Sequence, residues 1–184
     1  MIRFDGKSEV EEGDWLYEIV PFNNCVDFLQ GTIFQGNRLL DSIKSRRDSF
    51  FNLTKLEEEF FVFALDRTIF YMKMIKNIPE IVNILKKIDN TIGLEAIKDI
   101  RDMRTHVDEY KKGKGRVKER FFATPENTPP LLKNKPSIDA TSSIMINDWY
   151  LIGGRVDFYK TMEVLQEILP FVEKVCQAEK MKLL

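Results

Sequence analysis

The residues best suited to chemistry lie in one short segment, between Arg101 and His106. An arginine keeps its positive charge and can stabilise a phosphate, and a histidine titrates near neutral pH and can transfer a proton. This pair is sufficient for metal-free RNA cleavage, in which the imidazole takes the proton of a 2′-OH and the cation stabilises the pentacovalent phosphorane. Because His106 is the single histidine of the chain, histidine-rich zinc sites and di-iron sites with paired Glu-x-x-His motifs are excluded.

The spacing of this pair predicts a site shared between two copies of the chain. On one helix, Arg101 and His106 lie about 140° apart around the axis and about 7.5 Å apart along it. Both flank the apolar stripe and point toward solvent, whereas a two-fold axis would bring two copies of each into one groove. Asp102 is expected to orient the imidazole from four residues away. The alternative is an ordinary surface histidine beside an Arg104–Asp108 ion pair.

A basic segment follows this helix directly. Six of the ten residues from 111 to 120 are basic and one is acidic. We expect Lys112, Lys114 and Arg116, together with Arg104, to hold a phosphate backbone. The sequence lacks the spacing and the Ser/Thr of a Walker loop. The alternative is that these lysines only favour a helix C-terminus and a solvated loop.

Composition narrows the class of protein. The length of 184 residues predicts one domain spanning 1–184. Because 28 basic residues are balanced by 29 acidic ones, the chain has no net positive charge that would attract nucleic acid. The N-terminus has no apolar signal-peptide core and no stretch could span a membrane, which predicts a soluble, cytoplasmic protein. Cys25 and Cys176 form no CxxC motif, so neither a zinc knuckle nor a redox pair is indicated. No metal or organic cofactor is expected.

Helical spacing of apolar residues predicts an all-α fold, a four-to-five-helix up-and-down bundle. A loose lead-in over residues 1–13 precedes the first helix. The predicted helices cover residues 15–45, 54–77, 79–88, about 92–112, and a last stretch after the glycines at 153–154.

Residues 113–154 read as an insertion into the bundle, consisting of a Pro-rich loop and a small β-hairpin before the last helix. Four prolines fall between residues 113 and 141, which excludes a long helix there. Two apolar runs flank Asn147 and Asp148, which is typical of a hairpin turn. Trp149 and Tyr150 belong either to the core or to a partner surface, and the sequence leaves both open.

The second predicted helix is rich in aromatic residues. Core packing, together with a dimer interface, explains them better than a platform for stacking bases. A third reading is a small-molecule pocket lined by this helix. The aromatic residues are Phe60, Phe61, Phe63, Phe70 and Tyr71.

The run Arg101-Asp102-x-x-x-His106 on a late helix resembles the HEPN superfamily (higher eukaryotes and prokaryotes nucleotide-binding domain), which is marked by Arg, four to six residues, then His. The resemblance implies a metal-independent endoribonuclease whose cleft forms across a homodimer, with Arg101 and His106 as catalytic pair and Asp102 beside them. It also implies a toxin or phage-defence role with a cognate antitoxin. Because some members of this family only bind, the alternative is a catalytically inactive binding or regulatory module that acts through dimerisation and a protein partner.

Overall fold

A computed structural model describes residues 8–45, 53–121, 138–146 and 149–183, with only the backbone described at 8–18 and 146. These residues form six α-helices, a 3-10 turn and a small sheet, which confirms the predicted all-α fold. No helix in these ranges is long and apolar enough to cross a membrane. The elements are α1 (Ser8–Ser45), α2 (Leu53–Met74), α3 (Pro79–Ile92), α4 (Leu94–Thr105), α5 (Val107–Lys111), η2 (Lys118–Arg120), β1 (Ser143–Ile146), β2 (Trp149–Ile152), β3 (Val156–Asp157) and α6 (Phe158–Leu183).

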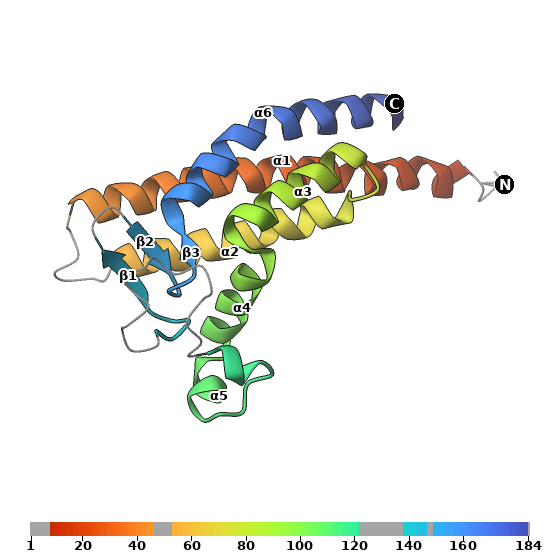
Figure 1. Ribbon diagram of the computed structural model, residues 1–184. Coiled ribbons are helices and arrows are strands. Elements are labelled where there is room, and N and C mark those ends of the chain that lie inside the picture. Colours follow the sequence, from red (N-terminus) through yellow and green to blue (C-terminus); the bar gives the residue numbers. More distant parts are fainter. Residues whose placement is uncertain (1–7, 46–52, 122–137, 147–148, 184) are drawn as a thin grey trace.

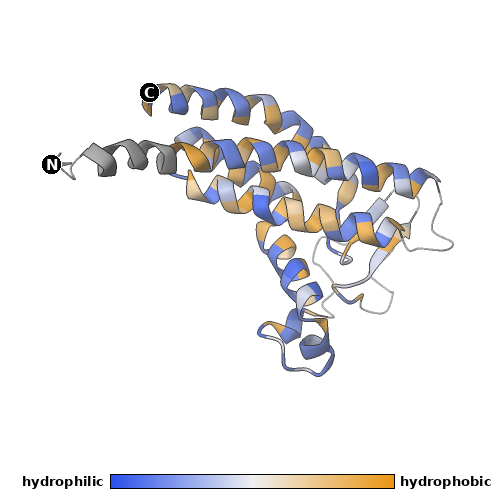
Figure 2. Ribbon diagram, turned by 180° about the vertical axis from the view of Figure 1, so that it is seen from behind, coloured by the Kyte–Doolittle hydropathy of each residue, from blue (hydrophilic) through white to orange (hydrophobic). Residues whose placement is uncertain are grey.

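Four helices pack in a ring around one core. α1 contacts α2 and α6, and α3 closes the ring by contacting both α2 and α6, as Figure 1 shows. α1 and α2 run in opposite directions, because Thr32 contacts Thr68 whereas the later Arg38 contacts the earlier Glu57. Figure 2 shows apolar and polar residues alternating along these helices, as expected when each turns one face inward. The largest core side chains include Leu29, Leu39, Phe61, Leu65, Met72, Ile81, Ile88 and Phe158.

α4 leaves the bundle and carries α5 at its far end (Figure 1). Gly93 ends α3 with a positive φ of 74°, a conformation that glycine adopts without steric cost. The sequence predicts one helix from about 92 to 112, and this prediction is wrong at His106. That residue leaves the helical conformation, with φ −117° and ψ 34°, so that α4 ends at Thr105 and α5 begins at Val107.

The predicted hairpin is confirmed and is larger than expected. β1 and β2 pair antiparallel with Ile146 opposite Trp149, and β3 adds a third strand that the sequence did not indicate. Gly153 and Gly154, with φ of 58° and 65°, turn the chain between β2 and β3. The turn residues Asn147 and Asp148 and most of the predicted Pro-rich loop lie outside the described residues.

One expectation is corrected at the start of the chain, and the two cysteines lie close together in the core. Residues 8–13, expected to be loose, belong to α1, which begins at Ser8. Cys25 and Cys176, 151 positions apart in the sequence, are free and buried on α1 and α6. Their thiols interact, and the hydrogen bond between them together with burial raises the pKa of Cys25. The core therefore holds a pair of thiols that the absence of a CxxC motif does not reveal.

Gly36 lies at a point where α1, α2 and α6 pack closely together. A Cβ at this position would collide with Met162 of α6 and lie 3.0 Å from the Phe61 ring of α2. Gly31, on the same helix, has no such neighbour within 4 Å. A side chain is therefore excluded at Gly36 by packing and tolerated at Gly31.

We predict opposite effects for the same substitution at these two glycines. Gly36→Leu lowers the free energy of unfolding by about 1–3 kcal/mol because the core is overpacked. Gly31→Leu raises it by about 0.5–1 kcal/mol because leucine has the higher helix propensity. Urea denaturation followed by circular dichroism measures both values, and equal changes at both positions would contradict the packing described here.

Candidate functional site

The segment from Arg101 to His106 spans the end of α4. This helix packs against α2 and buries the apolar stripe that the sequence predicts, including Ile97, Ile100 and Met103. The polar residues between these positions flank the stripe. The local geometry of Arg101, Asp102, Arg104 and His106 therefore decides what the segment can do.

Arg101 is held by two carboxylates. Its Nε lies 3.3 Å from Asp66 Oδ2 on α2, and its Nη1 lies 3.0 Å from Asp102 Oδ1. The side chain is 38% exposed and borders an open hollow of about 170 Å³ that Phe63 also lines. Two neighbouring negative charges offset the guanidinium, so it attracts a phosphate less than a free arginine would.

His106 lies at a different hollow. Its side chain is 55% exposed, and its Nδ1 is 3.8 Å from Glu109 Oε1. The hollow of about 250 Å³ beside it is lined by Asp99, Asp102, Tyr110 and Arg116 among others, and not by Arg101. The structure therefore does not bring the predicted catalytic pair together within one chain. The prediction that Asp102 orients the imidazole is not met either, because Asp102 pairs with Arg101.

The hollow beside His106 is acidic. Asp99 lies 2.9 Å from Arg120; burial raises the pKa of this carboxyl, while Arg120 and Arg155 oppose the rise. Arg120 also pairs with Glu95 at 3.1 Å. Arg120 is thus matched by carboxylates, and the acidic side chains that line the hollow outnumber Arg116, which disfavours an anionic ligand.

Arg104 is a structural residue rather than a ligand-binding one. Its side chain is only 5% exposed, and it pairs with Glu58 and, at 3.3 Å, with Glu59. Tyr150 of β2 donates a hydrogen bond of 2.7 Å to the second oxygen of Glu58. This buried network joins α2, α4 and the sheet, and it removes Arg104 from the residues expected to contact RNA.

The basic segment that follows α5 is exposed to solvent, as the sequence predicts. Lys112, Lys114 and Arg116 are exposed, and these three side chains make no ion pair with another described residue. The segment is folded back on itself, because Gly115 packs against the Tyr110 ring, which stacks on Phe121 at 5.6 Å. α5 and the turn that follows it therefore present free positive charges next to His106.

The aromatic residues of α2 divide between two surfaces. Phe61 is fully buried and meets Phe158 edge-on at 5.3 Å, whereas Phe60, Phe63 and Phe70 are exposed. The three outer rings face solvent rather than a cavity inside the bundle. This arrangement disfavours the reading in which α2 lines a small-molecule pocket.

The two aromatic residues of the hairpin differ in their burial. Tyr150 is buried and belongs to the core, while Trp149 is half-buried with the Lys160 ammonium 4.8 Å from its ring centre. A cation over the ring covers part of the surface that a partner would contact.

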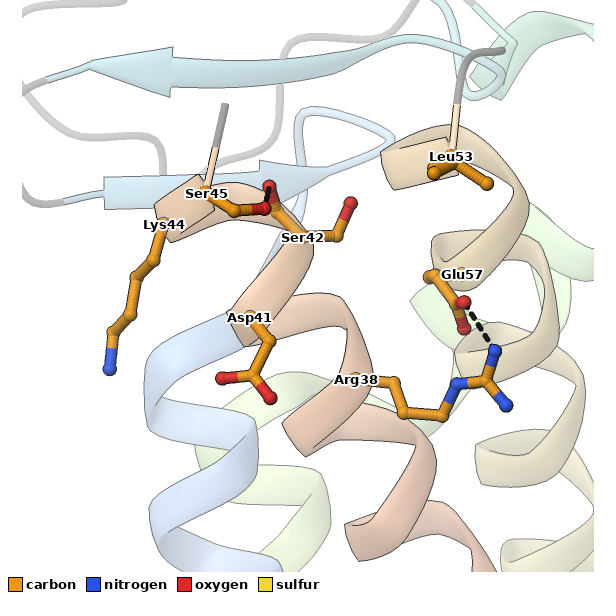
Figure 3. A pocket seen from close by; sticks show the side chains of 7 residues that line it. All are labelled: Arg38, Asp41, Ser42, Lys44, Ser45, Leu53 and Glu57. Atoms are coloured by element: carbon orange, nitrogen blue, oxygen red, sulfur yellow. Dashed lines mark hydrogen bonds and ion pairs between the residues drawn. The ribbon is translucent and has the colours of Figure 1, made fainter. Parts of the chain in front are cut away.

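A larger hollow of about 560 Å³ lies beside the end of α1 and the start of α2 (Figure 3). Across it, Arg38 pairs with Glu57 at 2.6 Å, and Gln35 also donates to that carboxylate. The one buried carboxylate of the hollow is therefore satisfied within the protein. Residues 46–52, which connect the two helix ends, lie outside the described ranges.

Sequence reasoning missed the residues that hold this region together. Asp66 and Glu58 lie on α2, 35 or more positions before their arginine partners, and Tyr150 lies on another element. By residue type alone, the acidic run from 57 to 59 is no more than favourable charge near the start of a helix. The available signal was that Glu58 falls on the same face as the buried Phe61 and Leu65.

The Tyr150–Glu58 hydrogen bond predicts a dependence of stability on alkaline pH. Burial and the nearby carboxylate raise the pKa of Tyr150 above its ordinary 10.0. The stabilisation is complete below about pH 10; above it the unfolded chain loses the phenolic proton and the folded chain keeps it, so stability falls by about 1.4 kcal/mol per pH unit. Tyr150→Phe should remove this contribution. Denaturation at pH 8–11 checks it, and parallel curves for both proteins would contradict it.

Comparison of the chain with known protein families, with curated proteins and with solved structures finds no match. The resemblance to the HEPN superfamily therefore rests on the spacing of Arg101 and His106 and on the helical pattern alone. Proposals about function must be argued from the residues of this chain.

Proposed function

We propose that this protein is a non-catalytic helical-bundle module that acts by association, through the exposed face of α2. The observation that carries the proposal is a row of apolar side chains on that face, each 37–52% exposed. The opposite face of the same helix is built into the core. We call this row the α2 stripe, and it consists of Leu53, Leu56, Phe60, Phe63, Phe70 and Met74.

The size of the α2 stripe supports an interaction surface. Half-exposed aromatic side chains of roughly 200 Å² each, with the leucines and the methionine, leave about 500 Å² of apolar surface per copy in contact with water. Contiguous patches of this size on a monomer are often functional. Two such faces would together bury about 1,000 Å², which is the lower limit for a biological protein interface.

The geometry around the predicted catalytic pair supports a non-catalytic role. Arg101 is offset by Asp66 and Asp102, and His106 lies in a separate acidic hollow. The neighbouring carboxylates weaken the attraction of both side chains for a phosphate.

A second candidate is a metal-independent RNA endonuclease of HEPN type whose Arg/His site forms across a homodimer. One observation favours it: His106 is exposed at the base of a segment whose Lys112, Lys114 and Arg116 are free to contact a phosphate backbone. A toxin or phage-defence role, with RNA or an antitoxin as partner, follows from the resemblance alone.

Association through α2 can be tested with one substitution and a matched control. Phe63→Ser should raise the dimer dissociation constant at least about tenfold, because an interface depends most on its central buried aromatic residues. Phe34→Ser changes a ring on α1 that is even more exposed than that of Phe63, and it should leave association unchanged. Sedimentation velocity over a range of concentrations measures both. A wild-type chain that stays monomeric throughout would refute the proposal.

The choice between association and catalysis is tested with RNA. The folded protein, incubated in EDTA with tRNA and with single-stranded RNA, should leave both substrates intact. Cleavage that is lost in His106→Ala, and that leaves 2′,3′-cyclic ends, would establish the endonuclease instead. Circular dichroism of the variant confirms that it remains folded.

A further inference from the structure

The α2 stripe follows a heptad repeat. Its members are separated alternately by three and four residues, and the one missing position is occupied by Arg67. The Arg67 guanidinium lies over the rings of Phe63 and Phe70, 5.4 and 5.8 Å from their centres. Alternating steps of three and four are typical of a helix that packs along its length against another helix. The stripe therefore has the form of a helix-pairing seam.

Charged residues line one edge of this seam in a definite order. Glu59 lies near its N-terminal end and Lys73 near its C-terminal end. Between them, Asp66 is already paired with Arg101. One end of the edge is thus negative and the other positive.

We infer that the α2 stripe binds the α2 stripe of a second copy of this chain, with the two helices antiparallel. This inference rests on the proposed association and specifies its partner and orientation. In this register Leu56 faces the partner's Met74, Phe60 faces the partner's Phe70, and Phe63 faces the partner's Arg67. The apolar side chains of each copy meet those of the other, and the arginine meets an aromatic face, which is a favourable contact.

Charge complementarity selects this orientation. An antiparallel pair places Glu59 of each copy, which also lies 3.3 Å from Arg104 of its own chain, beside the positive end of the other, near Lys73. Opposite charges therefore lie on both sides of the seam. A parallel pair would place Arg67 opposite a second Arg67 inside the seam, and like charges there oppose pairing. Antiparallel helix dipoles also attract rather than repel.

The antiparallel register changes the surroundings of Arg101. The two-fold axis passes close to Asp66, so the Asp66–Arg101 pairs of both copies lie near each other. The hollow that Phe63 and Arg101 line in one copy then becomes part of the interface. Arg101 would therefore lie at the edge of the dimer interface rather than in an open cleft.

Cysteine cross-linking distinguishes the two orientations. Leu56→Cys and Met74→Cys are prepared separately, mixed, and oxidised with diamide, which converts two thiols into a disulfide and is itself reduced to a hydrazine. The two positions lie about 27 Å apart along the helix, at 1.5 Å per residue. We expect disulfide-linked heterodimers in the mixture and none in either variant alone. Cys25 and Cys176 are fully buried and serve as the internal background, measured in the wild-type chain.

The outcomes of cross-linking and sedimentation test the helix orientation and the proposed association separately. Cross-linking of either variant with itself indicates parallel helices and overturns the inference. Absence of the heterodimer, in a protein that sedimentation shows to be dimeric, also overturns the inference but leaves association in place. A monomeric wild-type chain overturns the proposed function as well.

A charge substitution gives a second readout. Lys73→Glu places a negative charge beside the partner's Glu59 and should raise the dimer dissociation constant about two- to thirtyfold, since two exposed ion pairs are lost. Lys76→Glu makes the same change in net charge just beyond the end of α2 and should leave the constant unchanged. Equal effects of both would contradict the proposed register.

Discussion

The docking of α4 and of the sheet onto the four-helix ring depends on one buried carboxylate. Glu58 lies on α2 with a side chain only 3% exposed, and it accepts hydrogen bonds from Arg104 of α4 and Tyr150 of β2. A buried carboxylate without partners is strongly unfavourable. α4 and the sheet must therefore dock where their donors reach this group, and that requirement fixes how the segment carrying Arg101 and His106 is presented.

Ion pairing with carboxylates likewise explains why the arginines of α4 carry so little free positive charge. Arg101 and Arg104 each meet carboxylates of α2, and Arg120 meets Asp99 of α4 itself. These ion pairs orient α4 against the bundle, and they reduce the attraction of the same side chains for an anion. The lysines after α5 have no such partners among the residues that the structure describes, which is why the free charge of this region lies beyond the helix.

Much of the fold is predictable from the sequence because it depends on local periodicity. The helices of the ring, the stop before Pro79 and the strands on either side of residues 147–148 all follow from spacing and turn residues. The helix break at His106 has no such signal, since neither glycine nor proline lies there. The partners of Arg104 are equally hidden, because Glu58 is 46 positions away and burial of an ion pair depends on the tertiary fold. Of the candidate site, the sequence therefore predicts which residue types are present and which lysines are exposed, but not which charges are matched.

α2 has two apolar faces, one in the core and one exposed to solvent. Its residues Phe61, Leu65 and Met72 form part of the core, and this face already supplies the packing that folding needs. The residues on the opposite side, such as Phe60 and Phe63, add no core contact and leave large rings in water. Side chains of that size at regular heptad positions contribute to stability only when a second surface covers them. The two-faced pattern of α2 is therefore the basis of our proposal that the chain acts by association.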